Sequence, residues 1–181
     1  DRLMSCLDGA DQIEDMPDVW VLELSSFQLV YTHTLNATAA TVLNLTQDHL
    51  DWHGDMQAYA AAKSKIFGVD TVCVLNRDDA LVMSLLTEEQ KAEKSIVTFG
   101  SNRPDEQGAF GVEHDLRAGG IDWLVWAEVD EDIEPKPKRR RKSAAIEEDE
   151  PLRLKRLIPA DALRIRGRHN ALNALAALAL A

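Results

Sequence analysis

Short hydrophobic runs, separated by stretches with helical spacing, organise the first hundred residues of the chain. The runs are continuously apolar rather than alternating, which is typical of parallel strands that are covered on both faces. Four of them predict strands: 19–24, 39–45, 71–75 and 96–99. We expect the first two to be neighbours in one sheet. Strands that alternate with helices predict an α/β fold with a mostly parallel sheet flanked by helices.

The segments between these strands carry helix signals. Asp55 is placed to cap a helix that continues to about Phe67, where Gly68 supplies a stop. Asn76 and the two aspartates after it open a second helix, which we expect to continue to about Leu86.

The pattern changes after Gly100. Glycines punctuate residues 109–114 and 121–126, which predicts a small antiparallel hairpin attached to the main sheet. Residues 128–150 are acidic, then basic, then acidic again, and we expect this charged insertion to be disordered because it has little apolar surface to bury. Order resumes at Leu152, and an apolar helix begins near His169.

Composition narrows the function classes. With 181 residues and 45% hydrophobic content, the chain is long enough for one domain with a sizeable core. A formal net charge of -11 argues against a nucleic-acid surface, and the basic run 136–142 is interpreted as part of a solvated insertion rather than as a binding site for nucleic acid or anionic lipid. No apolar run approaches the roughly 20 residues of a membrane span, and no signal peptide is evident, so we expect a cytoplasmic protein.

Two cysteines give neither a disulfide framework nor a thiolate metal site. Cys73 lies within an apolar run and is expected to be a buried thiol, and Cys6 has no comparable setting. The chain starts without Met and stops inside an Ala- and Leu-rich segment without a C-cap, so we expect it to be a piece of a longer protein.

Candidate chemistry begins at the end of the first predicted strand. Glu23 ends an apolar run, and a buried carboxylate needs a cationic partner, which is either an Arg or Lys side chain or a metal ion. Ser25, Ser26 and Gln28 follow at once. They add neutral hydrogen-bonding groups, which fit an oxyanion or sugar-phosphate ligand.

A second polar cluster, Asp48, His49 and Asp51, follows the strand predicted at 39–45. One interpretation is a helix start or turn, where aspartates are common. The other is that His49 is a ligand of a divalent ion, with Asp48 as the acceptor that fixes its tautomer. Three other histidines lack such a setting and are expected to be surface or packing residues: His33, His53 and His114.

Lys63 is the most informative single residue. In a helix over 55–67 it shares a face with Tyr59, Ala62 and Ile66, whereas Lys65 points the other way. The simple interpretation is a lysine whose stem packs while its ammonium reaches solvent. The alternative is a buried amine that loses its proton and takes up carbon dioxide, which turns a cation into a metal-binding carbamate.

Several motifs together resemble the central domain of the Mur ligases. In chain order they are E-L-S-S-F-Q-L from Glu23, N-L-T-Q-D-H-L-D from Asn44, A-A-A-K-S-K-I-F from Ala60, L-N-R-D-D-A from Leu75 and G-R-H-N-A-L-N-A-L-A-A from Gly167. The resemblance implies a sheet like that of the P-loop nucleoside triphosphatases and an ATP-dependent amide ligase of peptidoglycan synthesis. The S-S-F-Q-L form is similar to that of members that add D-glutamate to UDP-N-acetylmuramoyl-L-alanine through an acyl phosphate.

The resemblance also implies roles for single residues. Glu23 matches the carboxylate that holds one magnesium ion between the ATP phosphates, while His49 and a carbamylated Lys63 match the ligands of a second magnesium ion. Ser25 and Gln28 match positions against the muramoyl substrate.

At the other end of the chain, Asn170 and Asn173, three positions apart on one helix face, match a pair that reaches the ATP adenosine. The implied partners are small molecules, namely ATP, D-glutamate and UDP-N-acetylmuramoyl-L-alanine. No nucleic acid and no membrane are implied, and the expected state is a monomer.

Some parts of the family pattern are missing from the 181 residues. The chain has no G-x-x-x-x-G-K-[ST] phosphate loop, which we expect upstream together with a UDP-binding domain, and a carboxy-terminal domain is expected downstream. The fragment alone is therefore expected to be nearly inactive. Two alternatives stay open: another amide ligase of this architecture, such as a different Mur ligase or a folylpolyglutamate synthetase, and a non-catalytic nucleotide-binding module.

Overall fold

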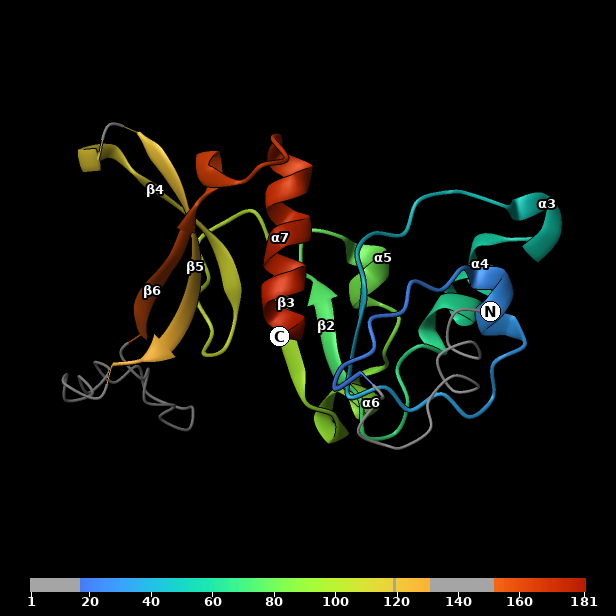
Figure 1. The fold of residues 1–181 in the computed structure, drawn as a ribbon. Helices are drawn as coiled ribbons and strands as arrows, with labels where there is room; N and C mark the ends of the chain where they lie inside the picture. Colours follow the sequence, from blue (N-terminus) through green and yellow to red (C-terminus); the bar gives the residue numbers. More distant parts are fainter. Residues whose placement is uncertain (1–16, 119, 131–151) are drawn as a thin grey trace, which may run out of the picture.

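A computed structural model describes residues 17–118, 120–130 and 152–181, and within them a single sheet of six strands follows the order of the sequence. The strands are β1 (Ala39–Val42), β2 (Val72–Asn76), β3 (Ile96–Phe99), β4 (Phe110–Asp115), β5 (Ile121–Val129) and β6 (Leu152–Pro159). β1 to β4 pair in parallel, and β4 to β6 pair antiparallel. The predicted α/β class, with a mostly parallel sheet and an antiparallel subsheet, is confirmed (Figure 1).

Helices connect and cover these strands. They are α2 (Ser26–Val30), α3 (Leu50–His53), α4 (Met56–Ser64), α5 (Ala80–Met83), α6 (Glu88–Glu93) and α7 (Arg168–Leu180), with two 3-10 turns, η2 (Leu116–Ala118) and η3 (Ala160–Ala162). The Asp55 carboxylate caps α4 by accepting from the Ala58 N–H at 2.8 Å. Both the predicted cap and the predicted start of α7 near His169 are confirmed.

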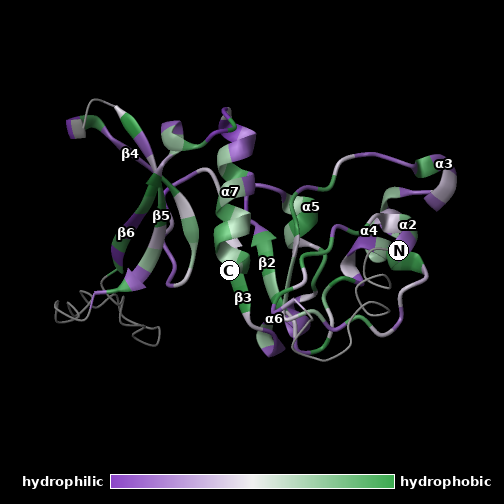
Figure 2. Ribbon diagram, in the orientation of Figure 1, coloured by the Kyte–Doolittle hydropathy of each residue, from purple (hydrophilic) through white to green (hydrophobic). Residues whose placement is uncertain are grey.

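Hydrophobic residues pack on both faces of the parallel strands. On β2, Cys73 and Leu75 point into a core shared with α4 and α5, while Val74 points into a core shared with α7, which lies across the sheet in Figure 1. All three are fully buried. The continuous apolar pattern of β2 therefore has the predicted cause, and Figure 2 shows this strand as hydrophobic over most of its length.

The strand predicted at 19–24 is wrong. Residues 19–25 form neither strand nor helix, and Val19 and Val21 are 75% and 90% exposed. Within the described residues, β1 is the edge of the sheet and pairs only with β2. An apolar run becomes a strand only where a neighbouring strand satisfies its backbone hydrogen bonds, and among residues 17–118, 120–130 and 152–181 this run has no such neighbour. The expected pairing of 19–24 with 39–45 fails for the same reason.

The first two residues of the predicted charged insertion, 128–150, belong to the sheet instead. Glu128 and Val129 belong to β5, where they pair with Arg153 and Leu152 of β6. Backbone pairing tolerates charged side chains on an exposed face, and the Arg153 guanidinium lies 3.8 Å from the Glu128 carboxylate. Leu152 begins β6, the third strand of the antiparallel subsheet. Residues 131–151, including the basic run 136–142, lie outside the described residues, as does Cys6.

The helix predicted from Asn76 to Leu86 is shorter than expected. It begins after the Asp79 cap and ends at Met83, and a separate helix, α6, begins at Thr87 with its own capping box. Among the described residues, no helix is long and apolar enough to cross a membrane.

Candidate functional site

The loops at the carboxyl ends of β1, β2 and β3 are tied together by the L-N-R-D-D-A segment. The Asn76 side-chain amide donates to the Leu43 carbonyl at 2.8 Å, and the Asp79 carboxylate accepts from the Leu45 N–H at 2.8 Å. The Asp78 carboxylate accepts from the Ser101 N–H at 2.8 Å. In open parallel sheets ligands bind beside these strand ends. This segment therefore holds in place the loop that leads to His49.

Arg77 connects the end of β2 to the antiparallel subsheet. Its guanidinium donates to both oxygens of Asn102 and, at 2.6 Å, to the Phe110 carbonyl. Burial lowers the pKa of Arg77, although nearby carboxylates, Asp78 first, act against this. The guanidinium stays charged under all ordinary conditions, so Arg77 is a permanent clamp between β2 and β4.

His49 adopts an unusual backbone conformation. It precedes α3 at φ 53° and ψ 30°, and is the only residue other than glycine with positive φ in the described parts of the chain. Its side chain is about half exposed, with Nε2 3.2 Å from the Asp48 carboxylate. Nε2 therefore faces Asp48, and Nδ1 is the ring nitrogen on the opposite side from this carboxylate.

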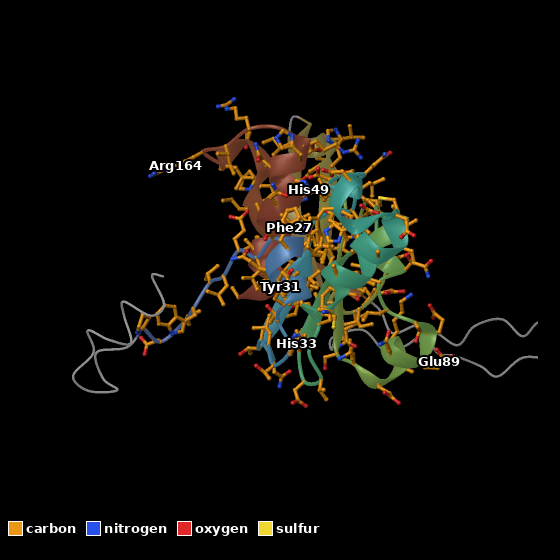
Figure 3. The ribbon with its side chains drawn as sticks, turned by 90° about the vertical axis from the view of Figure 1, so that its right-hand side faces the viewer. Phe27, Tyr31, His33, His49, Glu89 and Arg164 are labelled. Atoms are coloured by element: carbon orange, nitrogen blue, oxygen red, sulfur yellow. The ribbon has the colours of Figure 1, made fainter. Side chains whose placement is uncertain are left out.

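Aromatic rings surround this loop. The His49 ring lies 4.9 Å from that of Phe27, and Figure 3 shows the two side by side. Phe27 also contacts the rings of Trp52 at 4.9 Å and His53 at 5.7 Å. His53 in turn contacts Tyr59 at 5.1 Å. A chain of ring contacts therefore connects α2, α3 and α4.

Lys63 stands at the end of this chain of contacts. Tyr59 and Ala62 are buried and Lys63 is half-buried, which confirms the predicted packed face of α4. The Lys63 Nζ lies 6.0 Å from the centre of the Tyr59 ring. Within the described residues it forms no ion pair. Lys65 points elsewhere, and its ammonium donates to the Val30 carbonyl at the end of α2 at 2.8 Å.

Burial, and secondarily Asp48, raises the pKa of Tyr59. The phenol beside Lys63 is therefore neutral at physiological pH.

Glu23 and the two residues predicted to bind substrate lie at the start of α2. Glu23 is exposed, so the predicted cost of burying its carboxylate does not arise, and in the described parts of the structure it forms no ion pair. Ser25 and Gln28 form a capping box: the Ser25 N–H donates to Gln28 Oε1 at 2.8 Å, and the Gln28 N–H donates to Ser25 Oγ at 3.3 Å. The box leaves the Gln28 amide nitrogen available to a ligand.

Asn170 and Asn173 lie on α7, whose Ala171 and Leu175 face the sheet. The Asn170 amide donates to the Arg166 carbonyl at 2.8 Å, and Asn173 is exposed. The α7 pair thus lies on a different element from the loop and helices that carry His49 and Lys63.

The structure brings His49 and Lys63 into one set of contacts, through Phe27, His53 and Tyr59. Glu23 precedes the same helix α2 but joins none of these contacts. The described residues contain no group of three or more His, Cys, Asp or Glu side chains that could hold a metal ion. A cation here would have few ligands from this part of the chain.

Comparison with known proteins decides the family. The family model described as the Mur ligase middle domain matches residues 6–181. The chain belongs to the Mur ligase middle domain family. The resemblance seen in the motifs is thereby confirmed.

Named relatives of this Mur ligase middle domain are close along its whole length. It is 58% identical over 181 residues to the UDP-N-acetylmuramoylalanine–D-glutamate ligase of Ralstonia nicotianae. The matched region covers 99% of this chain and 34% of that protein. The protein of the same name from Paraburkholderia phymatum is 57% identical, covering 100% of this chain and 34% of that one. The chain spans about a third of the length of these relatives.

His53 was expected to be a surface or packing residue, and its packing is confirmed, because its ring touches three others. Sequence reasoning did not foresee the polar contact of this residue, whose Nε2 lies 2.9 Å from Ser26 Oγ. The signal that pointed to it was its position four residues after His49, one helical turn away.

Proposed function

We propose that this chain is the middle domain of an ATP-dependent ligase that joins D-glutamate to UDP-N-acetylmuramoyl-L-alanine during peptidoglycan synthesis. The 58% identity to a ligase of that name, over 99% of this chain, carries the proposal. In the reaction, the substrate carboxylate takes the γ-phosphoryl group of ATP and releases ADP. The amine of D-glutamate then attacks the acyl phosphate, forms the amide and releases phosphate.

The parent protein supplies the rest of the active site. We infer a glycine-rich phosphate loop and a UDP-binding domain before this segment and a closing domain after it, because the motifs resemble those of the Mur ligase central domain and the segment spans about a third of its named relatives. On this proposal the parent works as a cytoplasmic monomer and the 181-residue chain alone has almost no activity.

Two side chains in this part of the chain could each help to hold a magnesium ion. Glu23 offers an exposed carboxylate and His49 an imidazole nitrogen opposite the one that faces Asp48. Magnesium keeps several water ligands and is commonly held by only one or two protein groups together with phosphate oxygens, so a sparse set of ligands is sufficient. When bound, two such ions would neutralise charge on the ATP phosphates and on the acyl phosphate.

Lys63 is proposed to carry a carbamate. Its position supports this proposal: Lys63 is half-buried beside the Tyr59 ring, and among the described residues no acidic side chain pairs with its Nζ. The amine nitrogen bonds to the carbon of carbon dioxide and loses a proton to water. The product carries a negative charge on two oxygens, which are suitable ligands for the second magnesium ion.

The remaining proposed roles follow from exposed hydrogen-bonding groups. Gln28 presents its amide nitrogen to the muramoyl substrate while Ser25 fixes its side chain through the capping box. Asn173 is exposed on α7 and is the proposed base contact for ATP, and Asn170 stands one turn earlier beside it.

The test is phosphate release from ATP by the full-length protein with UDP-N-acetylmuramoyl-L-alanine and different amino acids. Stimulation by D-glutamate alone supports the proposal. Stimulation by another amino acid, or by L-glutamate with a folate, points to the other amide ligases, and no release with any amino acid points to a non-catalytic module. The purified 181-residue chain is the control, and D-glutamate-dependent release by it would refute the claim that this segment is inactive alone.

A further inference from the structure

The turn that follows His49 has little support of its own. α3 is four residues long, none of them is buried, and His49 provides no side-chain cap. Helices this short are not stable in isolation. The backbone hydrogen bonds of α3 stay within the turn. The Trp52 and His53 N–H groups donate to the His49 carbonyl at 3.1 and 3.0 Å, and the Gly54 N–H donates to the Leu50 carbonyl at 2.8 Å. Side chains must therefore hold the turn in place.

His53 makes side-chain contacts to both neighbouring helices. Its Nε2 lies 2.9 Å from the hydroxyl of Ser26, which belongs to α2 and is only 2% exposed. Its ring stacks on Phe27 at 5.7 Å and contacts Trp52 edge-on at 4.5 Å and Tyr59 at 5.1 Å. One imidazole thus connects α3 to both α2 and α4.

His49 depends on this arrangement in two ways. The carbonyl of His49 accepts the His53 N–H, and Phe27 touches both imidazole rings. In addition, a residue with a side chain is strained at positive φ and stays there only when its surroundings hold it. The contacts of His53 are the part of those surroundings that reaches into the core.

We propose that His53, hydrogen-bonded to Ser26, is a positioning residue that fixes the α3 turn and thereby the orientation of the His49 imidazole toward its cation. This inference rests on the proposed function, since it assigns His49 a magnesium ligand role. His53 itself touches neither metal nor substrate in this scheme. It is comparable to the outer groups that hold metal-binding histidines in place elsewhere.

The experiment compares Ser26→Ala, His53→Phe and His53→Gln in the full-length protein. Ser26→Ala removes the hydroxyl alone, His53→Phe keeps a ring without the hydrogen bond, and His53→Gln keeps a hydrogen-bonding group without the ring. The matched control is His114→Phe, because His114 also has one side-chain partner, Asp122 at 2.6 Å, but lies on β4.

Two measurements are made on each variant. The magnesium concentration for half-maximal ligation is expected to rise on the order of tenfold in Ser26→Ala and His53→Phe, with little change in kcat at saturating magnesium. Hydrogen exchange, followed by mass spectrometry, is expected to accelerate over residues 50–54 in both. The double variant should be no worse than the more severe single one, His53→Gln should recover part of the magnesium effect, and His114→Phe should change neither quantity.

The exchange measurement does not depend on activity. Wild-type exchange over 50–54 in both Ser26→Ala and His53→Phe would overturn the proposal, whether or not the protein is a ligase. Faster exchange with an unchanged magnesium requirement would also overturn it, because His53 would then be structural only. Absence of ligase activity in the wild-type protein would instead refute the proposed function.

Discussion

Asp79 is expected to support both local stability and the loop that carries His49. One carboxylate oxygen caps α5 by accepting from the N–H groups of Leu81 and Val82 at 2.9 and 3.2 Å. The other accepts from the N–H of Leu45, a residue that is only 2% exposed. Replacing Asp79 with alanine leaves all three donors without this acceptor.

The expected loss combines two contributions. Removing an N-cap costs about 1 kcal/mol, and leaving a buried N–H such as that of Leu45 unpaired costs about 1–3 kcal/mol. Asp79→Ala should therefore lower the free energy of unfolding by about 2–4 kcal/mol. Thr87→Ala is the matched control, because Thr87 caps α6 through the Gln90 N–H without holding a second loop, and should cost only about 1 kcal/mol.

Urea denaturation followed by circular dichroism measures both changes, and hydrogen exchange at the Leu45 amide measures the loop directly. Asp79→Asn keeps one acceptor oxygen and should fall between wild type and alanine. Equal losses for Asp79→Ala and Thr87→Ala, with the Leu45 amide still protected, would show that this loop is held by something other than the Asp79 carboxylate.

Three further changes test other parts of the site. Lys63→Ala in the full-length protein should abolish most turnover, bicarbonate should not restore it and a small carboxylic acid should do so in part; normal turnover would exclude the carbamate. His49→Val should lower the free energy of unfolding by about 1 kcal/mol more than His49→Asn, because asparagine tolerates positive φ, and equal urea midpoints would contradict this. Burial raises the pKa of the Cys73 thiol in the folded protein. The contribution of this thiol to the free energy of unfolding should therefore be fully present below the ordinary thiol pKa and be lost as pH rises through the higher pKa of the folded state. Urea titrations at pH 7–10 measure this slope, and Cys73→Ala should remove the part that the thiol contributes.

Strands β1, β2 and β3, the α4 cap and α7 were predictable from sequence because their signals are local. A continuous apolar run, an aspartate before a helical pattern and an Ala- and Leu-rich stretch each express a backbone preference or a burial pattern within a few residues. The packed position of Lys63 followed in the same way from the three-and-four spacing of α4.

The failures have a common origin in contacts between distant segments. Residues 19–24 are as apolar as β2, but a strand also needs a pairing neighbour. Glu128 sits in a charged stretch, yet β6 pairs with it and makes it part of β5. The composition of a segment contains no information on which strand will pair with it.

The candidate site divides along the same line. The motifs gave the resemblance to the family and drew attention to His49 and Lys63, because the residue types and spacing are present in the chain itself. Only the packing of α2, α3 and α4 decided that His53 meets Ser26 and lies in the set of ring contacts between His49 and Lys63. Glu23 is exposed and does not join these contacts. Side-chain chemistry is set by the sequence, but which groups meet is set by long-range packing, whose free energy depends on the whole fold.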